Sequence, residues 1–362
     1  MSTLMFKHLT QAIRGVPYTY SASVRKVSTV LGVSGRQYIR GEVLHKNQRG
    51  NPTIFKATYV LTSLSLSHSL VISNNTRRGN ESVILKQESE SIFDLSRRLA
   101  DEFAGSRRLR MPVDFNPEER IVVYQYFRDT LLGLVRANPD FPADELKKVL
   151  RYVGEALQEF HAKGWLHLDV KPDNIFVDWT CDENGNKTVT DATLGDFGIA
   201  FKPVNATPLR TGFALGNVMW RSPEQQTGSG MTKASDVFSY GLVCVYALGG
   251  EFLLLSDEGE LAELAKHGIT PREDILTRHF TYFGLANEGL LKQVDSSEHG
   301  ILKKASETAG RAVKDQPKLQ LAEWGQDLGE AGLYMISGMT KPDPAARLTI
   351  DEVLECSWWQ EP

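Results

Sequence analysis

The stretch GWLHLDVKPDN, residues 164–174, constrains this chain of 362 residues more than any other. Asp169, Lys171 and Asn174 lie within six residues, in a run that an internal proline keeps from being helical. A carboxylate can accept a hydroxyl proton, an ammonium can neutralise a moving phosphate, and an amide oxygen can bind Mg²⁺. The segment LGDFG at residues 194–198 adds Asp196 as a second metal ligand. Together these residues predict a phosphoryl-transfer site, since that chemistry needs positioning and charge neutralisation more than covalent catalysis.

Composition narrows the class of protein further. The formal net charge of −4 argues against a surface that coats nucleic acid. The three cysteines lie far apart and form no metal-binding or disulfide pattern, which fits a reducing compartment. The longest apolar run, near residues 241–248, is too short to span a bilayer, so we expect no membrane insertion. An intracellular protein, cytoplasmic or nuclear, is the expectation.

Residues 1–41 differ from the remainder in charge. They contain no Asp or Glu but six Lys or Arg residues, and Met5, Leu9 and Ile13 recur at helical spacing. This pattern is typical of a mitochondrial presequence, and it also fits a disordered basic tail. We therefore treat residues 1–41 as a leader outside the fold, with a mitochondrial location as the alternative.

Hydrophobic periodicity predicts an α+β chain of two lobes. Short β-branched runs at residues 53–61, 82–87 and 120–127 predict strands, and helical periodicity dominates after residue 130. We expect a small β-rich lobe at 42–127, with an insert at 59–82, and a larger helical lobe at 128–362. A helix ending near Gly164, a hairpin at Asn184–Gly185 and an apolar core helix near residues 235–248 are expected in the second lobe.

The ordered set of motifs resembles the eukaryotic protein kinase family over roughly residues 42–360. The motifs are HLDVKPDN at 167–174, DFG at 196–198, SPE at 222–224 and SDVFSYG at 235–241. The resemblance implies that Asp236 holds the backbone of the catalytic loop and that Arg347 pairs with Glu224. It also implies the bilobal kinase fold, Asp169 and Lys171 as catalytic residues, and Asn174 and Asp196 as ligands of Mg²⁺ and ATP.

The resemblance also assigns ATP-binding residues in the small lobe. It implies a lysine on the third strand, which Lys86 in VILK fits, and a glutamate partner on the next helix. The apolar stripe of that helix places Glu102 at its edge, so we predict a Lys86–Glu102 ion pair. Tyr124 would border the adenine pocket. The backbone of Gln125, Tyr126 and Phe127 would contact adenine.

Two departures from the family pattern are visible. Where a glycine-rich loop is expected, LHKNQRGNPTIF retains only Gly50, so backbone amides approach the ATP phosphates less closely. Leu168 replaces the arginine that gathers a phosphorylated activation segment, so we expect no phosphate switch unless Lys202 or Arg221 substitutes. Neither change removes a group that touches the transferred phosphate.

The resulting prediction is a protein kinase that transfers phosphate from Mg-ATP to serine or threonine of protein substrates. Lys171 favours this specificity, while Asn217 stands where such kinases carry threonine. The main alternative is a nucleotide-binding pseudokinase scaffold, and a small-molecule phosphotransferase is a more distant one. The chain has no P-loop, HExxH or GxSxG motif.

Overall fold

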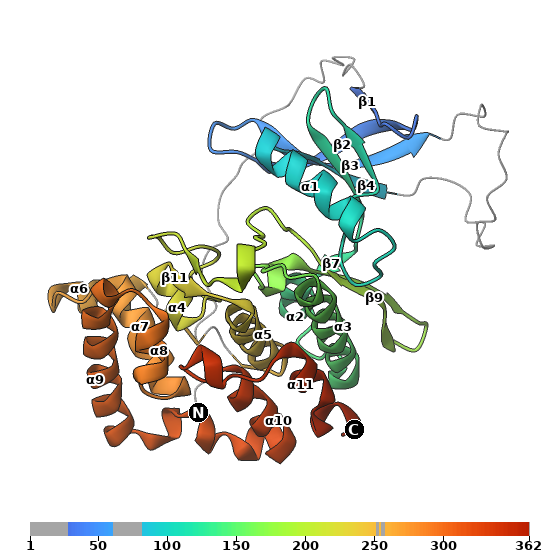
Figure 1. Cartoon of the computed structure of the whole chain (residues 1–362). Helices are drawn as coiled ribbons and strands as arrows, with labels where there is room; N and C mark the ends of the chain where they lie inside the picture. The colour runs from blue at the N-terminus through green and yellow to red at the C-terminus, as the bar shows by residue number, and fades with distance from the viewer. Residues whose placement is uncertain (1–27, 61–81, 251–252, 255–257, 362) are drawn as a thin grey trace, which may run out of the picture.

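The structure is a computed structural model that describes residues 28–60, 82–250, 253–254 and 258–361. Figure 1 shows two lobes: a sheet with helix α1 (Glu90–Glu102) above a larger helical body. The α+β, two-lobed prediction is confirmed. The predicted insert at 59–82 falls almost entirely on residues outside those described.

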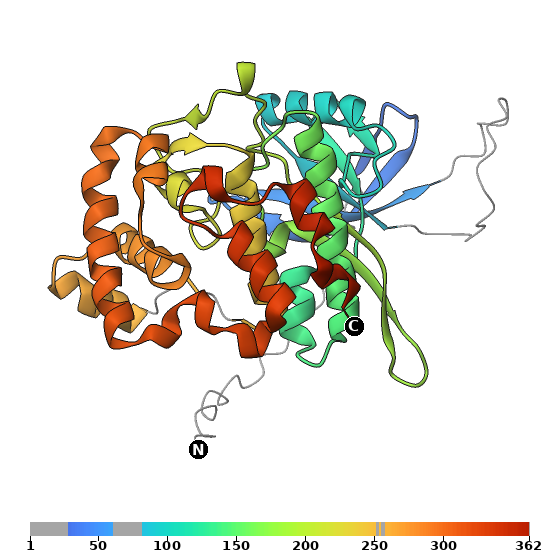
Figure 2. The same ribbon diagram turned by 60° about the horizontal axis from the view of Figure 1, so that its bottom comes forward.

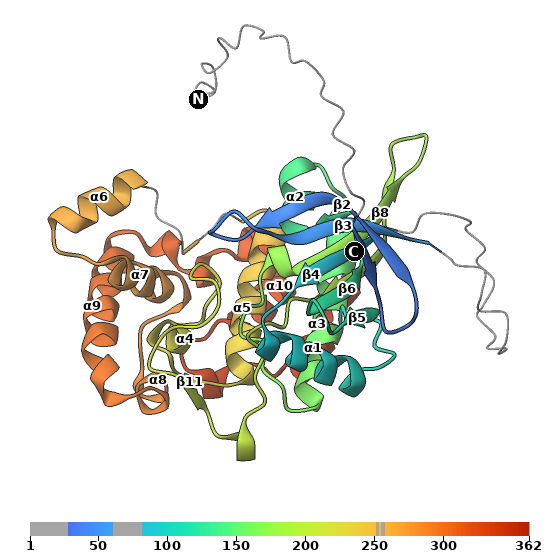
Figure 3. The same ribbon diagram turned by 90° about the horizontal axis from the view of Figure 1, so that it is seen from above.

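The small lobe is built on one six-stranded sheet of strand order β1-β2-β3-β4-β6-β5, in which all neighbours are antiparallel. The predicted strands appear as β3, β4 and β6, each rich in β-branched or aromatic residues. Figure 3 shows β2, β3, β4 and β6 side by side, with α1 beside them. The strands are β1 Thr29–Leu31, β2 Gln37–Lys46, β3 Pro52–Val60, β4 Ser82–Gln87, β5 Asp114–Asn116 and β6 Ile121–Gln125.

The boundary of the predicted leader at residue 41 is wrong. Strand β1 and the first part of β2 lie within it, and Tyr38, 1% exposed, belongs to the core of this lobe. Asp114 on β5 fixes the segment by accepting hydrogen bonds from the Tyr38 hydroxyl at 2.7 Å and from Ser34. The basic, acid-free composition concealed two strands in which Val30 of β1 and Tyr38 of β2 are the buried apolar residues before residue 41. The targeting prediction for residues 1–27 lies outside the described residues.

The large lobe is mainly helical and contains a three-stranded sheet of order β7-β8-β9 and a two-stranded sheet of β10 and β11. The predicted hairpin is β8–β9, with Gly185 at φ 84° in its turn. The strands are β7 Asp129–Thr130, β8 Ile175–Cys181, β9 Lys187–Leu194, β10 Leu209–Arg210 and β11 Ser229–Met231. The helices are α2 Leu131–Ala137, α3 Ala143–Ala162, α4 Pro223–Thr227, α5 Lys233–Ala247, α6 Glu258–Lys266, α7 Pro271–Phe283, α8 Glu288–Gln293, α9 His299–Asp315, α10 Gly325–Met339 and α11 Ile350–Glu355.

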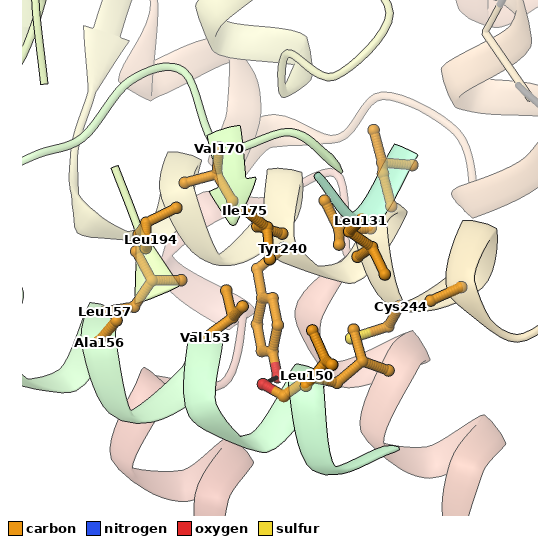
Figure 4. Close-up of a cluster of buried hydrophobic side chains, with 14 of the residues drawn as sticks. Leu131, Leu150, Val153, Ala156, Leu157, Val170, Ile175, Leu194, Tyr240 and Cys244 are labelled. Atoms are coloured by element: carbon orange, nitrogen blue, oxygen red, sulfur yellow. Dashed lines mark hydrogen bonds between the residues drawn. The ribbon is translucent and has the colours of Figure 1, made fainter. Parts of the chain in front are cut away.

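Helix α5 is the centre of the large lobe, as its nearly continuous apolar sequence predicts. Its residues from Ser235 to Ala247 are all buried. In Figure 4, Tyr240 and Cys244 of α5 face Leu150 and Val153 of α3, and the Tyr240 hydroxyl donates to the Leu150 carbonyl at 2.7 Å. This contact satisfies a buried hydroxyl and fixes α3 against α5, so the loop that follows α3 starts from a rigid support.

Helices α7, α8 and α9 lie together at one side of the large lobe, in orange at the left of Figure 2, and they carry a second apolar cluster. Its fully buried members include Leu276, Phe280 and Leu302. The three cysteines are free thiols, as expected. Among the residues that the structure describes, no helix has both the length and the apolar character needed to cross a membrane.

Candidate active site

The predicted catalytic loop is suspended from the buried carboxylate of Asp236 on α5. This carboxylate accepts hydrogen bonds from the backbone amides of His167 at 2.8 Å and Leu168 at 2.7 Å, and it contacts His161 at 2.9 Å. Leu168 is thereby held at φ 63°, a left-handed conformation that costs a leucine free energy. The predicted role of Asp236 is confirmed.

Asp169 is oriented from both sides of its carboxylate. Its Oδ2 accepts from the Lys171 ammonium at 2.7 Å and from the Asn174 amide at 3.1 Å, and its Oδ1 accepts from the backbone amide of Asn217 at 2.7 Å. Asn217 thus contacts Asp169 through its backbone, while its side-chain oxygen accepts from the backbone amide of Met219 at 3.0 Å. A pocket of about 420 Å³ opens beside these groups and also contacts Asp196.

Lys86 on β4 lies between two carboxylates. Its ammonium is 2.8 Å from Oδ1 of Asp196 and 2.9 Å from Oε1 of Glu88. Burial lowers the pKa of Lys86, but the charges of Asp196 and Glu88 outweigh burial and raise it above its usual value. For Asp196, burial raises the pKa, and the stronger effect of Lys86 lowers it. Both groups are therefore charged at neutral pH.

The predicted Lys86–Glu102 ion pair is wrong. Glu102 contacts Lys202 at 2.6 Å, at the C-terminal end of α1. Helical periodicity assigns a residue to a face of the helix but not to a position along its axis. Glu102 lies about 18 Å along α1 from its first residue, at about 1.5 Å per residue, whereas Lys86 precedes that first residue by only four positions.

The residue that sequence reasoning missed is Glu88. It follows Lys86 by two positions, directly after β4, so the period of a strand continued by one residue places both side chains on the same face. Its side chain is 9% exposed. The two-residue spacing of Lys86 and Glu88 therefore indicates this contact from the sequence, whereas the family resemblance implies a partner for Lys86 on the helix.

The structure does not bring Gly50 to the pocket beside Asp169. Gly50 lies at the exposed tip of the β2–β3 hairpin with φ 78°, and the amides of Arg49, Gly50 and Asn51 all donate to Asn47. In this conformation the backbone amides at the tip are engaged by Asn47 and are not available to a phosphate. Its predicted contact with the ATP phosphates requires the hairpin to rearrange.

The predicted hinge, Gln125 to Phe127, connects β6 to β7 and hence the two lobes. Tyr124, directly before it, pairs with Ile84 of β4, two positions before Lys86 along that strand. The Gln125 carbonyl accepts a hydrogen bond of 2.6 Å from Arg110. No motif in the sequence indicated Arg110.

Leu168 anchors the activation segment, between Asp196 and Glu224, through apolar packing. It is 1% exposed and clusters with Leu166 and Met231, against which Leu209 and Leu215 of the segment pack. The nearby cations already have partners: Lys202 contacts Glu102, Arg210 contacts Asp295, and Arg221 donates to the Leu215 and Gly216 carbonyls. These contacts support the expectation of a phosphate-independent segment.

The predicted Glu224–Arg347 pair closes the end of that segment. The guanidinium donates to both carboxylate oxygens, at 2.8 and 2.9 Å, and both side chains are 0% exposed. Burial raises the pKa of Glu224, but the charge of Arg347 together with hydrogen bonds from Arg347, Ser235 and Ser222 outweighs burial, so the pKa is lowered. Arg347 also donates to the backbone carbonyls of Ala234, Lys341 and Pro342, so each nitrogen of its guanidinium has a hydrogen-bond acceptor.

The residues predicted to hold Mg²⁺ suit a hard cation. The Asn174 amide nitrogen donates to Asp169, which leaves the amide oxygen to coordinate a metal ion, and Asp196 is ionised. An ionised carboxylate and an amide oxygen are ligands that Mg²⁺ accepts together with water and phosphate. Among the described residues, no cluster of three His, Cys, Asp or Glu side chains forms a separate metal site.

Comparison with known proteins agrees with this geometry. Residues 112–359 match the protein kinase domain family, and the chain belongs to that family. It is 31% identical over 160 residues to the serine/threonine-protein kinase Pkn1 of Myxococcus xanthus, covering 44% of this chain and 22% of Pkn1. PknA of Mycobacterium tuberculosis is 40% identical over 120 residues (33% and 25%), and PrkC of Bacillus subtilis is 33% identical over 140 (38% and 20%). The chain spans a quarter or less of the length of these curated relatives.

Proposed function

We propose that this chain is a protein serine/threonine kinase that transfers the γ-phosphate of ATP to protein substrates. The observation that carries the proposal is Asp169, whose carboxylate is oriented by Lys171, Asn174 and the amide of Asn217 beside an open pocket. The names of the similar proteins in bacteria support the serine/threonine class.

The chemistry follows from the roles of these side chains. Asp169 accepts the proton of a serine or threonine hydroxyl while the oxygen of that hydroxyl bonds to the γ-phosphorus. The bond from that phosphorus to the bridging oxygen breaks, and ADP leaves with the electron pair. Lys171, already 2.7 Å from Asp169, is placed to neutralise charge on the transferred group. Lys86 would hold the remaining phosphates.

Mg²⁺, held by Asn174 and Asp196, would neutralise the clustered charge of the triphosphate when bound. Lys86 now contacts Oδ1 of Asp196, so this lysine also keeps the carboxylate ionised and oriented before the metal binds. An intracellular location, and a protein substrate rather than nucleic acid, remain part of the proposal.

The decisive test replaces Asp169 with asparagine, which keeps the shape of the side chain and removes the base. We expect Asp169→Asn to lower turnover by about 10²- to 10⁴-fold in a phosphotransfer assay with Mg-ATP. Asp173→Asn is the matched control, since it makes the same change four residues away on an exposed side chain. Equal transfer by wild type and Asp169→Asn would refute the enzymatic function.

The hairpin tip favours one alternative, a pseudokinase scaffold that binds nucleotide without transferring phosphate. Its amides at Gly50 and Asn51 are engaged with Asn47. This alternative predicts nucleotide-dependent thermal stabilisation together with no phosphotransfer in either wild type or Asp169→Asn. Phosphoserine or phosphothreonine detected by mass spectrometry on a substrate of wild type alone would exclude it.

A further inference from the structure

Arg110, in the loop between α1 and β5, extends its side chain from the small lobe toward the hinge. Its backbone amide donates to the Leu194 carbonyl at 2.7 Å. A Cβ atom at the next residue, Gly195, would lie 3.0 Å from both the Arg110 Cβ and the Phe176 ring. The glycine therefore leaves the space that the arginine side chain needs at this point.

The guanidinium of Arg110 ends against the hinge. Its Nη2 donates to the Gln125 carbonyl at 2.6 Å, and its carbon lies 3.9 Å from the centroid of the Phe176 ring. The ring centroids of Tyr124 and Phe127 are 5.0 and 5.8 Å away. A flat cation with three aromatic neighbours gains cation–π attraction in addition to its charge-assisted hydrogen bond. These contacts stabilise the side chain in one position.

That position is the one that the base of a bound nucleotide needs. Asn174 and Asp196, the proposed metal ligands, mark the end of the site where the phosphates bind. Phe176 follows Asn174 by two positions, and the charge of Asp196 acts on the guanidinium of Arg110. A base that reaches from the phosphates to the hinge requires the face of Phe176 and the Gln125 carbonyl, and both are occupied. Arg110 therefore excludes every nucleobase alike in this conformation.

The structure also offers Arg110 a way out. Burial lowers its pKa to about 10, which leaves the side chain charged at neutral pH. Among the described residues its buried Nε has no hydrogen-bond acceptor, and such a donor costs free energy. A pocket of about 590 Å³ between this loop, the hinge and β9 is lined by Arg110 and by the carboxylate-bearing Asp191. A displaced guanidinium could be solvated and paired there.

We propose that Arg110 is a self-inhibitory side chain, which occupies the base-binding position and must withdraw before a nucleotide binds. The proposal rests on the proposed function, since it assumes that the base of ATP binds at the hinge. It leaves ATP as the phosphate donor. It lowers the affinity for ATP by the free energy that holds the guanidinium against Gln125 and Phe176.

The test measures the affinities of adenosine and of Mg-ATP for the full chain by calorimetry. Arg110→Ala removes the side chain, and Arg110→Met is a second variant without donors in case alanine does not fold, as judged by the melting temperature without ligand. Arg107→Ala is the matched control, an exposed arginine in the same loop. We expect the Arg110 variants to bind both ligands about tenfold more tightly than wild type does, because no charge-assisted hydrogen bond has to break.

The direction of the change separates displacement from a simple effect of charge. Removing a cation by itself weakens the binding of a triphosphate and leaves neutral adenosine unaffected. A gain for both ligands therefore supports the proposal. An adenosine affinity that does not rise in the folded Arg110 variants would overturn it, as would a rise for Mg-ATP alone or an equal rise in Arg107→Ala.

This outcome is separate from that of the proposed function, because binding is measured without phosphotransfer. Tighter binding in the Arg110 variants without phosphotransfer in any protein supports self-inhibition and refutes the kinase. Phosphotransfer with unchanged affinities supports the kinase and refutes self-inhibition.

Discussion

Exchanging Glu88 for glutamine tests whether the strand, rather than helix α1, supplies the partner of Lys86. In the structure the ammonium has two carboxylate contacts, 2.9 Å to Glu88 and 2.8 Å to Asp196. Glu88→Gln retains the size of the side chain and removes the charge. Lys86 then depends on Asp196 alone, and that carboxylate must also bind the metal.

The expected magnitude follows from the burial of the pair. Lys86 and Glu88 have side chains that are 26% and 9% exposed, so solvent screens their contact only partly. A charge-assisted hydrogen bond in such a setting contributes about 1.5–3 kcal/mol. At about 1.4 kcal/mol per factor of ten, kcat/KM should fall by about 10- to 100-fold. A raised KM for the nucleotide would show that ground-state binding by Lys86 is affected, and a lowered kcat would show an effect confined to the transition state.

The assay is initial-rate phosphotransfer at varied Mg-ATP, with Glu102→Gln as the matched control. Glu102 pairs with Lys202, away from Lys86, so its variant should retain kcat/KM within about twofold, as befits a partly exposed ion pair. Normal kinetics in Glu88→Gln combined with a large loss in Glu102→Gln would refute the reasoning and restore the helix-borne partner.

Two further predictions concern the segment that ends at Glu224. Arg347→Met should cost about 3–5 kcal/mol by leaving a buried carboxylate unpaired, and adding Glu224→Gln should recover most of it in urea unfolding at pH 7. The pH dependence of the free energy of unfolding should reverse. The lowered pKa of Glu224 makes wild type lose this stability as pH falls below about 4. In Arg347→Met only burial acts on Glu224 and raises its pKa, so this variant should lose stability as pH rises from about 4 to 7. A variant curve parallel to wild type would contradict this. Phosphatase treatment, or Thr207→Ala with Thr211→Ala, should leave phosphotransfer within about twofold, because leucine packing orders the segment; loss of activity in either would show that a phosphate is required.

The parts of the site that the sequence predicted are those fixed by short spacing. Asp169, Lys171 and Asn174 lie within six residues, so one loop conformation brings them together regardless of the wider fold. Asp236 and Arg347 lie farther away, but each has few alternatives once its helix is recognised from periodicity and motif. For these residues, local pattern and tertiary contact agree.

The errors have a different origin. Glu102 was predicted as the partner of Lys86 from the face of the helix on which it lies. Its position along the helix axis, which depends on tertiary packing, brings it to Lys202 instead. The position of Arg110 was not predicted, because it contacts Gly195 and Phe176, which lie 85 and 66 positions later in the chain, and no local pattern relates these residues. The strand β1 was missed because three residues carry too little periodicity to outweigh a basic composition.

The contact of Ser34 and Tyr38 with Asp114 bears on how the small lobe behaves as a molecule in solution. The segment after β1 also bonds to β5 through Val33 and the Phe115 carbonyl at 2.8 Å, so the two outer strands of the sheet cover each other. A chain that starts at residue 42 would lose β1 and the first part of β2, which would uncover residues 57–60 of β3 and one side of β5 and present unpaired backbone groups to other chains. Such a chain should form multimers in size-exclusion chromatography, whereas one that starts at residue 28 should not.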